Sequence, residues 1–259
     1  MRALDTAATG MKAQEMQLDQ IANDMANMNT VGYKQQRTEF KDLMYQTIKD
    51  PGGEGGVSQA PVGIQTGAGV AVAAQYSIHE QGPAQVTNGK MDLMINGEGF
   101  FQVQTPNGLV AYTRDGSFKT DSQGRVLNTA GFPLLPPIQL PSDTTSVKIN
   151  PQGMVSVTTS KGQEQQVGQI QIANFINPSG TRKVGGNLFM PTVASGAPIQ
   201  GNPGDGVLGT VQQGMLEGSN VHPTEAIMSM IKTQIGFETN AKITGVVDQM
   251  WSTANNMAK

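Results

Sequence analysis

Residues 4–28 read LDTAATGMKAQEMQLDQIANDMANM and contain an apolar seven-residue repeat. The first heptad position holds Leu4, Met11, Leu18 and Met25. The second, three residues later, holds Ala7, Gln14, Ile21 and Met28. Seven of these eight residues are apolar, as in a coiled-coil seam or a helix-packing stripe. The repeat predicts a helix that stops at residues 29–32, where Gly32 supplies the helix stop.

A second helix is predicted near the other end of the sequence, over residues 223–256. Ser219 and Asn220 offer capping groups, and Pro223 suits a first helical turn. Glu225 favours the positive end of the helix dipole. Apolar side chains then recur mostly at spacings of three or four residues and fall on one face, namely Met228, Ile231, Ile235, Ile243, Val247 and Met250.

The apolar period changes from 3.6 to 2 between the two helices. The runs 91–95 and 100–104 are separated by Asn96-Gly97, and Pro106-Asn107-Gly108 leads into a further run at 109–113. Alternation continues over residues 147–149, 154–157 and 167–175. Short runs between Asn-Gly and other glycine-containing turns indicate an antiparallel β domain.

We therefore predict an α+β protein with a discontinuous helical, coiled-coil-like domain from both termini and an inserted antiparallel β domain. Residues 50–69 are rich in Gly, Pro, Ser and Gln, which indicates a loop or an extended arm. The predicted boundaries are an N-terminal helical region at 1–45, an arm at 46–75, a β-rich domain at 76–215 and a C-terminal helix, paired with the N-terminal one, at 216–259.

Composition excludes several classes of protein. The formal net charge is −3, and runs of like charge are missing, so nothing indicates a nucleic-acid-binding surface. The sequence has no cysteine, which excludes disulfides, thiolate metal sites and cysteine nucleophiles. No run of about 20 apolar residues predicts a membrane span. Met1 to Asp5 lead into no long apolar core, so we expect no secretory signal peptide.

Both predicted helices carry methionine-rich apolar faces, which suit adaptable packing against partners. Isolated amphipathic helices are marginally stable, and an exposed stripe of this kind is an association site. Contacts between copies that do not close into a ring generate a helical filament. The alternative is a hairpin within one chain that covers both faces, and the pattern alone leaves both open.

The thirteen residues 22–34, ANDMANMNTVGYK, resemble the N-terminal signature of flagellar rod and hook proteins. The matching residues are Ala22, Asn23, Ala26, Asn27, Asn29, Thr30, Gly32, Tyr33 and Lys34, whereas Asp24 and Met25 depart mildly from it. Further matches follow in family order at 97–101 (GEGFF), 112–118 (YTRDGSF) and Ser219-Asn220-Val221. Residues 235–240, IGFETN, stand where the family shows a more polar run.

This resemblance implies a structural subunit that polymerises helically, with terminal helices packed as a tube around an export channel. The segment from Asp42 to Gly52 resembles the arm of distal-rod members, which implies a stiff hollow shaft that transmits torque to the hook. The implied partners are further copies of the chain, proximal rod proteins, the hook protein, the surrounding rings and the flagellar (type III) export apparatus. The implied location is the basal body, across the periplasm. A proximal-rod or short hook-like axial protein is the alternative.

Few residues indicate a catalytic site. We expect that the protein is not an enzyme and that it binds no cofactor or metal. His79 and His222 are the only histidines and lack metal-ligand spacing. Residues 63–69 superficially resemble a phosphate-binding loop but lack its Gly-Lys-Ser/Thr ending. The alternative from another class is a peptidoglycan-acting hydrolase or glycan-binding module. A hydrolase would need two carboxylates in a cleft, and the candidates Glu98 and Asp115 lie in predicted turns.

Some remaining side chains suit an interface or a core. Arg114 and Lys34 are candidate subunit contacts, with a solvated surface role as the alternative. The aromatic residues of the patterned segments are expected in a core by default, and they are Tyr33, Phe100, Phe101 and Phe118.

Overall fold

The computed structural model describes residues 2–49 and 62–257. Two helices flank a β-rich middle, which confirms the predicted α+β class. The chain divides into two compact units. We call one the helical unit, formed by the described residues among 1–25, 36–76 and 222–259, and the other the β unit, formed by residues 26–35 and 77–221.

The helical unit contains both helices, α1 (Arg2–Ala26) and α2 (Pro223–Met257). The prediction for α2 is confirmed to within a residue, with Pro223 in its first turn. Helix α1 ends at Ala26, earlier than the predicted stop, because the next residues form turns in which Thr30 N–H donates to the Asn27 carbonyl. Met28 therefore lies beyond the helix and off its predicted heptad stripe.

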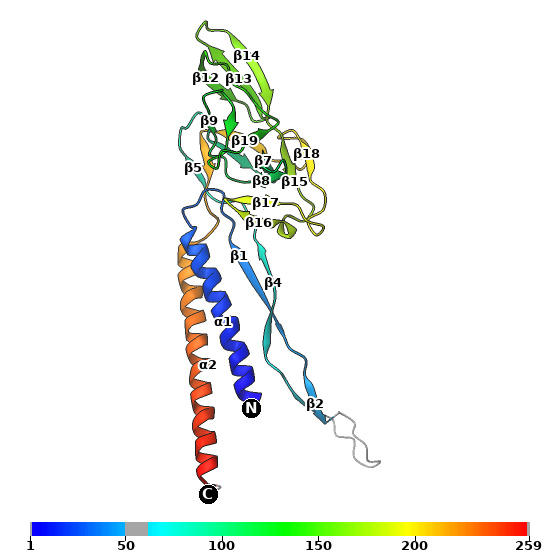
Figure 1. The fold of residues 1–259 in the computed structure, drawn as a ribbon, viewed down its shortest axis with the longest axis vertical. Coiled ribbons are helices and arrows are strands. Elements are labelled where there is room, and N and C mark those ends of the chain that lie inside the picture. Colours follow the sequence, from blue (N-terminus) through cyan, green and yellow to red (C-terminus); the bar gives the residue numbers. More distant parts are fainter. Residues whose placement is uncertain (1, 50–61, 258–259) are drawn as a thin grey trace. The chain divides into compact units, whose positions relative to one another are not determined.

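Helices α1 and α2 lie side by side and run antiparallel (Figure 1). Small residues set their approach, since a Cβ atom at Gly10 would lie 2.9 Å from Asn240 Nδ2. A Cβ atom at Gly236 would likewise lie 3.2 Å from the carboxamide carbon of Gln14. Both glycines therefore lie where the two helices approach each other closely.

Strand pairs complete the helical unit on another face of α1. Strand β1 (Gln36–Asp42) pairs with β4 (Val70–Ser77), and β2 (Gln46–Lys49) pairs antiparallel with β3 (Ile64–Thr66). Asp24 of α1 accepts a hydrogen bond from Gln36 N–H, and Val70 N–H donates to Thr9 Oγ1 at 3.4 Å. Residues 50–61, within the predicted arm, lie outside the described part of the chain.

The β unit is built on a seven-stranded sheet with the order β16-β17-β8-β7-β15-β18, to which β11 adds by pairing with β7. Its strands are β7 (Phe100–Gln104), β8 (Val110–Thr113), β11 (Leu134–Leu135), β15 (Ile172–Asn174), β16 (Arg182–Gly185), β17 (Leu188–Met190) and β18 (Ile199–Gly201). The hairpin from β7 to β8 turns at Gly108, whose φ of 77° favours glycine.

Smaller sheets surround this one. A three-stranded sheet contains β12 (Thr144–Ile149), β13 (Met154–Thr159) and β14 (Glu164–Gln169). Three further pairs are β5 (Ala84–Val86) with β20 (Met215–Glu217), β6 (Leu93–Asn96) with β19 (Thr210–Gln213), and β9 (Lys119–Thr120) with β10 (Val126–Leu127). A short 3-10 helix, η1, spans Pro178–Gly180.

The core of the β unit is apolar. Its most deeply buried members include Leu93, Phe101, Val103, Leu134, Val157 and Ile172, each with no exposed surface. A second aromatic cluster forms around Phe100, where Tyr112, Phe175 and Phe189 pack on the other face of the sheet strands. The expectation that Phe100, Phe101, Phe118 and Tyr33 are core residues is confirmed, because all four are buried.

The predicted single run at 167–175 is two strands in two different sheets. Strand β14 ends at Gln169 in the three-stranded sheet, and β15 starts at Ile172 in the seven-stranded one. Ile170, between them, is 1% exposed, and its N–H donates to the carbonyl of Gly153. Alternation of apolar residues continues through this crossing because the chain stays buried while it changes sheets.

Candidate functional site

The predicted apolar stripe of α2 is exposed to solvent in the single chain. Exposed fractions range from 45% for Ile243 to 65% for Met250, with Met228, Ile231 and Ile235 between these values. Val247 alone among the predicted stripe residues is half-buried. Ile227, Phe237, Val246 and Trp251 add to the exposed apolar surface of this helix.

Helix α2 instead turns small and polar residues inward. Its buried residues are Ala226 and Thr233, and Gly236, Asn240 and Thr244 continue the same face at spacings of three or four. Gly236 lies close to Gln14 of α1, and Asn240 lies close to Gly10. The contact with α1 therefore uses little of the large apolar surface of α2, and the single-chain hairpin does not cover the stripe.

The predicted seam of α1 is partly covered. Ile21 is buried, whereas Leu4, Met11, Leu18 and Met25 are half-buried and Met28 is exposed. Buried polar residues share this helix with Ile21, since Gln20 and Asp24 face the strand that begins at Gln36. Helix α1 thus has protein on two sides, unlike α2.

A buried ion cluster lies in the β unit at Lys34, Arg114 and Glu217. Lys34 Nζ forms an ion pair with Glu217 Oε1 at 2.5 Å, and Arg114 Nη1 lies 3.2 Å from Glu217 Oε2. The side chains of Lys34 and Glu217 are fully buried, and that of Arg114 is 4% exposed. Backbone groups complete the cluster, because Lys34 Nζ donates to the Glu80 carbonyl at 2.6 Å and Arg114 Nη2 donates to the Gly97 carbonyl at 2.9 Å.

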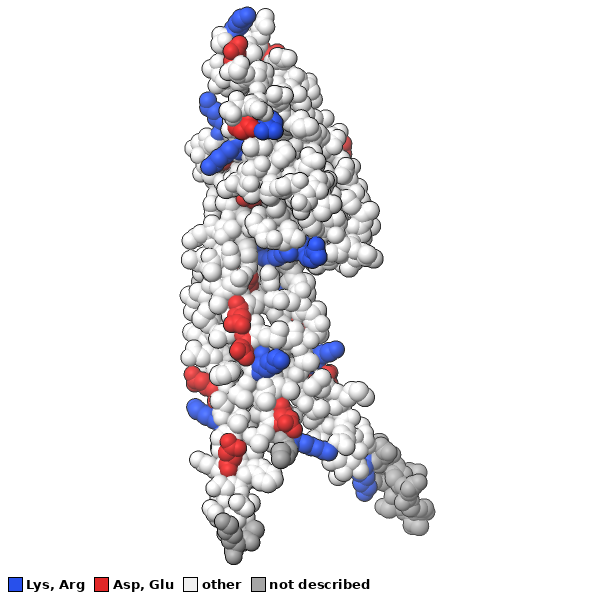
Figure 2. Space-filling view, in the orientation of Figure 1, with Lys and Arg blue, Asp and Glu red and all other residues white. Residues whose placement is uncertain are grey.

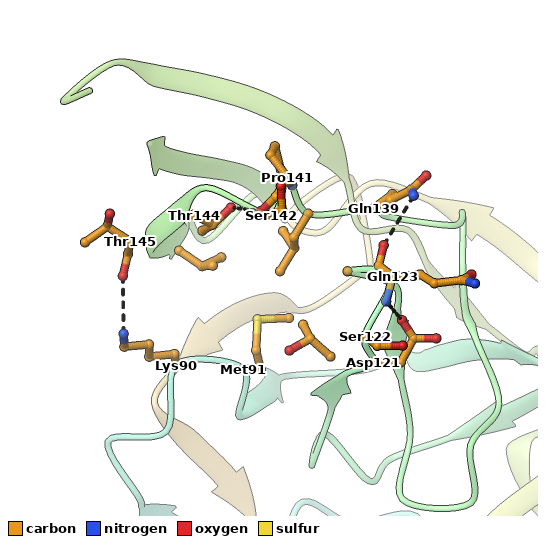
Figure 3. A pocket seen from close by; sticks show the side chains of 14 residues that line it. Lys90, Met91, Asp121, Ser122, Gln123, Gln139, Pro141, Ser142, Thr144 and Thr145 are labelled. Carbon is orange, nitrogen blue, oxygen red and sulfur yellow. Dashed lines mark hydrogen bonds between the residues drawn. The ribbon is translucent and has the colours of Figure 1, made fainter. Parts of the chain in front are cut away.

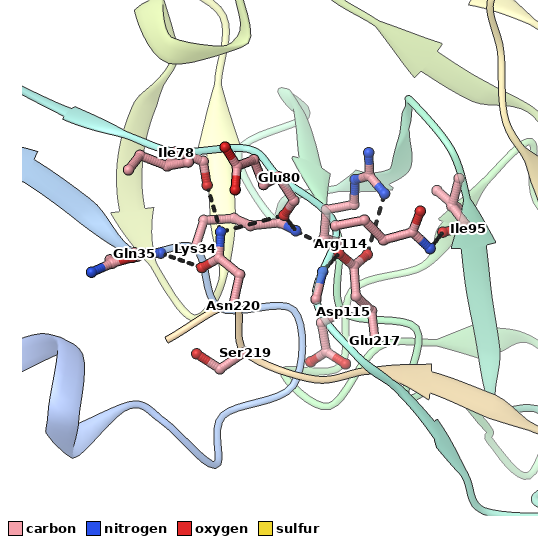
Figure 4. Close-up of polar contacts among 12 residues, drawn as sticks. Lys34, Gln35, Ile78, Glu80, Ile95, Arg114, Asp115, Glu217, Ser219 and Asn220 are labelled. Atoms are coloured by element: carbon pink, nitrogen blue, oxygen red, sulfur yellow. Dashed lines mark hydrogen bonds and ion pairs between the residues drawn. The ribbon is translucent and has the colours of Figure 1, made fainter. Parts of the chain in front are cut away.

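Residues from all four sequence motifs take part in this cluster or its surroundings. Figure 4 labels Lys34, Arg114 and Asn220 from three of them. Lys34 comes from residues 22–34, Gly97 from 97–101 and Arg114 from 112–118. Asn220, from the last motif, accepts the N–H of Gln35 and donates to the Ile78 carbonyl at 2.9 Å. The motif residues thus hold the N-terminal and C-terminal chain segments together inside the β unit.

Glycine is required where the first motif reaches the third. Gly32 has a φ of 68°, and a Cβ atom there would lie 2.7 Å from the backbone carbon of Arg114. Its N–H donates to the carbonyl of Glu217 at 2.8 Å. Either a left-handed conformation or a backbone contact this close disfavours a larger residue.

The remaining motif residues divide by position. Ala22, Asn23, Ala26 and Asn29 are exposed, Asn27 and Thr30 are half-buried, and Tyr33, Ser219, Asn220 and Val221 are buried with Gly32 and Lys34. Lys183 Nζ lies 4.8 Å above the centre of the Tyr33 ring and donates to the Lys34 carbonyl. The buried half of the motif is therefore held by specific polar contacts.

Burial is the largest cause of the pKa shifts at the cluster. Burial lowers the pKa of Lys34 and that of Arg114 from their ordinary values, and Glu217 opposes the shift in both. His79 lies near this cluster and packs edge-on against Phe100 and Phe189. Burial, together with the charges of Lys34, Arg114 and Lys183, lowers the pKa of His79 to about 3, so this ring is neutral at pH 7.

The expectation that Lys34 and Arg114 are subunit contacts or solvated surface residues is wrong for the folded chain. Both are inside the β unit, and the cause is Glu217, which lies 183 residues from Lys34 in the sequence and pairs with both cations. Glu217 was missed because it lies two residues outside the motif at 219–221. A carboxylate within an otherwise apolar strand segment, Met215–Glu217, was the available signal.

The β unit has a surface hollow lined by residues such as Lys90, Asp121 and Gln139 (Figure 3). Its volume is about 870 Å³, and Asp121 is the one carboxylate that lines it. Asp121 is already paired with Arg125, whose Nη2 lies 2.7 Å from Oδ2. A pair of carboxylates, as glycan hydrolysis requires, is therefore missing from this hollow.

The two other carboxylates considered for catalysis have structural partners. Asp115 accepts hydrogen bonds from Ser117 N–H and Oγ in a turn, and Glu98 accepts one from Asn174 Nδ2 at 2.9 Å. Across the described residues, no group of three or more His, Asp or Glu side chains is placed to hold a metal ion. Residues 64–66 of the glycine-containing loop form strand β3, as part of a strand pair and not a phosphate cradle.

Charged side chains are scattered over the visible surface, and neither sign gathers into a large patch (Figure 2). None of the described helices is both long enough and apolar enough to cross a membrane. The exposed stripe of α2 is therefore the most pronounced candidate interaction surface of the helical unit.

Three family models match successive parts of the chain. Residues 4–34 match "Flagella basal body rod protein", residues 94–157 match "Flagellar hook protein FlgE/F/G D1 domain", and residues 212–257 match "Flagellar basal body rod FlgEFG protein C-terminal". The first match ends at Lys34, and the last begins shortly before Glu217. The ion cluster thus joins segments from all three matched regions.

Curated relatives match over nearly the whole chain. The flagellar basal-body rod protein FlgG of Buchnera aphidicola (subspecies Acyrthosiphon pisum) is 43% identical over 93% of this chain and 94% of its own length. FlgG of Caulobacter vibrioides is 42% identical over 96% of this chain and 97% of its own length. The rod protein FlgF of the same bacterium is 34% identical over 88% of this chain and 85% of its own length.

Proposed function

We propose, from the premise that this chain belongs to the flagellar basal-body rod protein family, that the exposed stripe of α2 is a contact between copies of the chain. The chain is a structural subunit of the flagellar basal-body rod. In the proposed assembly, copies add through non-closing contacts and form a helical, hollow shaft. Its subunits transmit torque through many packed contacts.

One observation carries this proposal. Three large apolar residues of α2, Met228, Ile231 and Ile235, are each more than half exposed, although α1 lies against the same helix. Soluble chains rarely keep such a stripe uncovered unless a partner covers it. Methionine and isoleucine side chains bury well against the helices of a neighbouring copy, in a coiled-coil-like seam with the half-buried residues Leu4, Met11, Leu18 and Met25.

The distal part of the rod is the position that we propose for this subunit. The support is twofold: the chain is more similar to FlgG than to FlgF of one bacterium, and residues 42–52 resemble the arm of distal-rod members. In this proposal the arm at residues 46–75 adds contacts between copies and keeps the rod straight. Its described strands β2 and β3 expose Ile48 and Ile64, and the exposed residues Met44 and Tyr45 lie directly before it, so all four are available for such contacts.

The remaining partners and the location follow from the same proposal. Proximal rod proteins would lie at one end of the polymer and the hook protein at the other, with basal-body rings around the β domain. Subunits would reach this place, across the periplasm, through the flagellar export apparatus and without a cleaved signal peptide. No catalytic role is part of the proposal.

The test replaces Ile231 by glutamate in a strain that makes only this variant. Ile231 is 53% exposed, so Ile231→Glu leaves the isolated chain folded, as circular dichroism would report. A charge buried without a partner in a subunit contact is strongly unfavourable, so we expect loss of incorporation and of swimming. Electron microscopy of purified basal bodies would then show where assembly stops.

Ala241→Glu is the matched control. Ala241 is exposed on the same helix, about 80° around the axis from Ile231 and about 120° from Ile235, so it lies outside the row of Met228, Ile231 and Ile235 and should tolerate the charge. A rod stub without a distal segment or hook supports the distal position. A complete rod that lacks only its hook assigns the chain to the hook side, and normal rods with Ile231→Glu reject the stripe as a contact.

A further inference from the structure

Methionine side chains are distributed unequally over the two units. The sequence has 15 methionines and no cysteine, so thioethers are its only sulfur groups. Six described methionines are exposed by more than about a third, namely Met16, Met28, Met44, Met228, Met250 and Met257. All of these except Met28 belong to the helical unit. Met94, in the β unit, is 4% exposed.

Two of the exposed methionines belong to the apolar stripe of α2. Met228 is 59% exposed and precedes Ile231 by three residues, so the two side chains are neighbours on one helix face. Met250, at 65%, continues the exposed apolar surface toward the C-terminal end of the helix. Any change in the polarity of these thioethers changes the surface that a second copy would meet.

A peroxide makes that change by transferring one oxygen atom to the methionine sulfur. The thioether loses two electrons and becomes a sulfoxide, while the peroxide is reduced and its O–O bond breaks to release water or an alcohol. The product is polar and chiral, and it disrupts methionine-rich contacts. The step is reversible by reduction of the sulfoxide. With no thiol in the chain, no cysteine competes for the oxidant.

We propose that Met228 and Met250 form an oxidation site that controls whether a free subunit can assemble. The inference rests on the proposed contact between copies through α2. In the free chain both side chains are more than half exposed and can meet a peroxide, and their sulfoxides place polar oxygen atoms in the apolar stripe. A docked copy shields them, so oxidation stops new incorporation and spares subunits that are already in the rod.

The first experiment measures the order of oxidation in the purified full chain. Hydrogen peroxide is added, and peptide mass spectrometry follows the gain of one oxygen atom at each methionine. We expect Met228 and Met250 to be converted while Met94 remains a thioether. Conversion of Met94 together with the other two would contradict the accessibility on which the proposal depends.

The second experiment measures incorporation in cells that make the chain during sublethal peroxide exposure. We expect wild-type cells to lose complete rods, whereas the double variant Met228→Leu/Met250→Leu keeps them, since leucine is similar in volume and cannot form a sulfoxide. Met16→Leu/Met28→Leu removes as many exposed thioethers from outside the stripe and should remain as sensitive as the wild type.

Equal loss of rods in all three strains overturns the oxidation site. The failure of this inference and that of the proposed function are separable, because Ile231→Glu tests the contact without peroxide. Blocked assembly in Ile231→Glu combined with equal peroxide losses rejects the oxidation site alone. Normal assembly in Ile231→Glu rejects the contact itself.

Discussion

The β unit and the helical unit differ in which side chains they bury. In the β unit the interior holds both the large apolar residues and an ion cluster, with Lys34 and Glu217 fully removed from solvent. In the helical unit α2 buries Ala226 and Thr233, while Ile231 and Ile235 remain more than half exposed. The first unit satisfies its strongest interactions internally, whereas the second retains apolar surface for a partner.

This contrast shows that residues of a family motif and residues of a contact surface can be different sets. The buried motif residues, such as Gly32 and Lys34, make contacts inside the β unit that stabilise it. The exposed apolar residues of α2 lie outside the four motifs at 22–34, 97–101, 112–118 and 219–221. In a polymer subunit, motif residues can therefore serve the fold of one copy while the contact surface is recognised by its periodicity and exposure.

The largest expected effect comes from the ion cluster. Glu217→Gln keeps the shape of the side chain but leaves Lys34 and Arg114 as buried cations without their anion. Removal of one partner from a buried pair destabilises a protein by about 3–5 kcal/mol. Hydrogen exchange in β7 and β8 across a urea series would measure this loss in the free energy of unfolding of the β unit.

An exposed ion pair provides the control for Glu217→Gln. Arg125→Gln breaks the contact with Asp121, in which the Arg125 side chain is 54% exposed, and we expect no measurable change. Equal stability losses in the two variants would mean that burial does not distinguish the cluster from a surface pair. The buried ion cluster would then not distinguish the β unit from the helical unit.

A smaller loss is expected at Gly32. Both Gly32 and Gly108 have positive φ, at 68° and 77°, so alanine at either position is strained by about 1–2 kcal/mol. A Cβ atom at Gly108 meets nothing within 4 Å, but at Gly32 it would press on the backbone of Arg114. In urea unfolding, Gly32→Ala should therefore lower the free energy of unfolding by about 1–3 kcal/mol more than Gly108→Ala does.

The difference between the two glycine variants is the informative quantity. It removes the shared conformational strain and leaves the close approach between the first and third motifs. Equal losses would show that Gly32 is required for its backbone conformation alone. The motifs would then be joined mainly through the side chains of Lys34, Arg114 and Glu217.

Periodicity predicted the helices and most strands because these depend on local patterns. The heptads at Leu4 to Met25 and the spacing from Met228 onward gave helices within a few residues of those found. The alternating runs at 100–104 and 154–157 likewise coincide with strands β7 and β13. The crossing at Ile170 was not predictable from alternation, since a buried connection between sheets has the same apolar pattern as a strand.

Long-range pairing accounts for what sequence reasoning missed. Lys34 and Arg114 were expected at a surface because their anion lies far along the chain, 183 residues from Lys34 and 103 from Arg114. The inner face of α2 was missed for another reason. Thr233, Gly236 and Asn240 carry little apolar signal, yet small side chains permit the close approach that decides which helix face meets α1.

The smallest expected effect tests that close approach directly. Gly245 lies in α2 with nothing within 4 Å of a Cβ atom, so Gly245→Ala should stabilise the helix by about 0.5–1 kcal/mol. Gly10→Ala has the same advantage in α1, but its Cβ would lie 2.9 Å from Asn240 Nδ2 and must displace that side chain. We expect little or no net gain there, measured by thermal unfolding followed through Trp251, the single tryptophan of the sequence.

Gly10→Ala combined with Asn240→Ala should restore the gain, because the obstructing carboxamide is gone. Equal stabilisation by Gly10→Ala and Gly245→Ala would mean that α1 and α2 do not meet through their small residues. A different face of α2 would then pack against α1. The apolar face is the one whose burial there would be most favourable. That result would favour the self-covered hairpin over the exposed stripe, so this small difference bears on the contact that assembly is proposed to use.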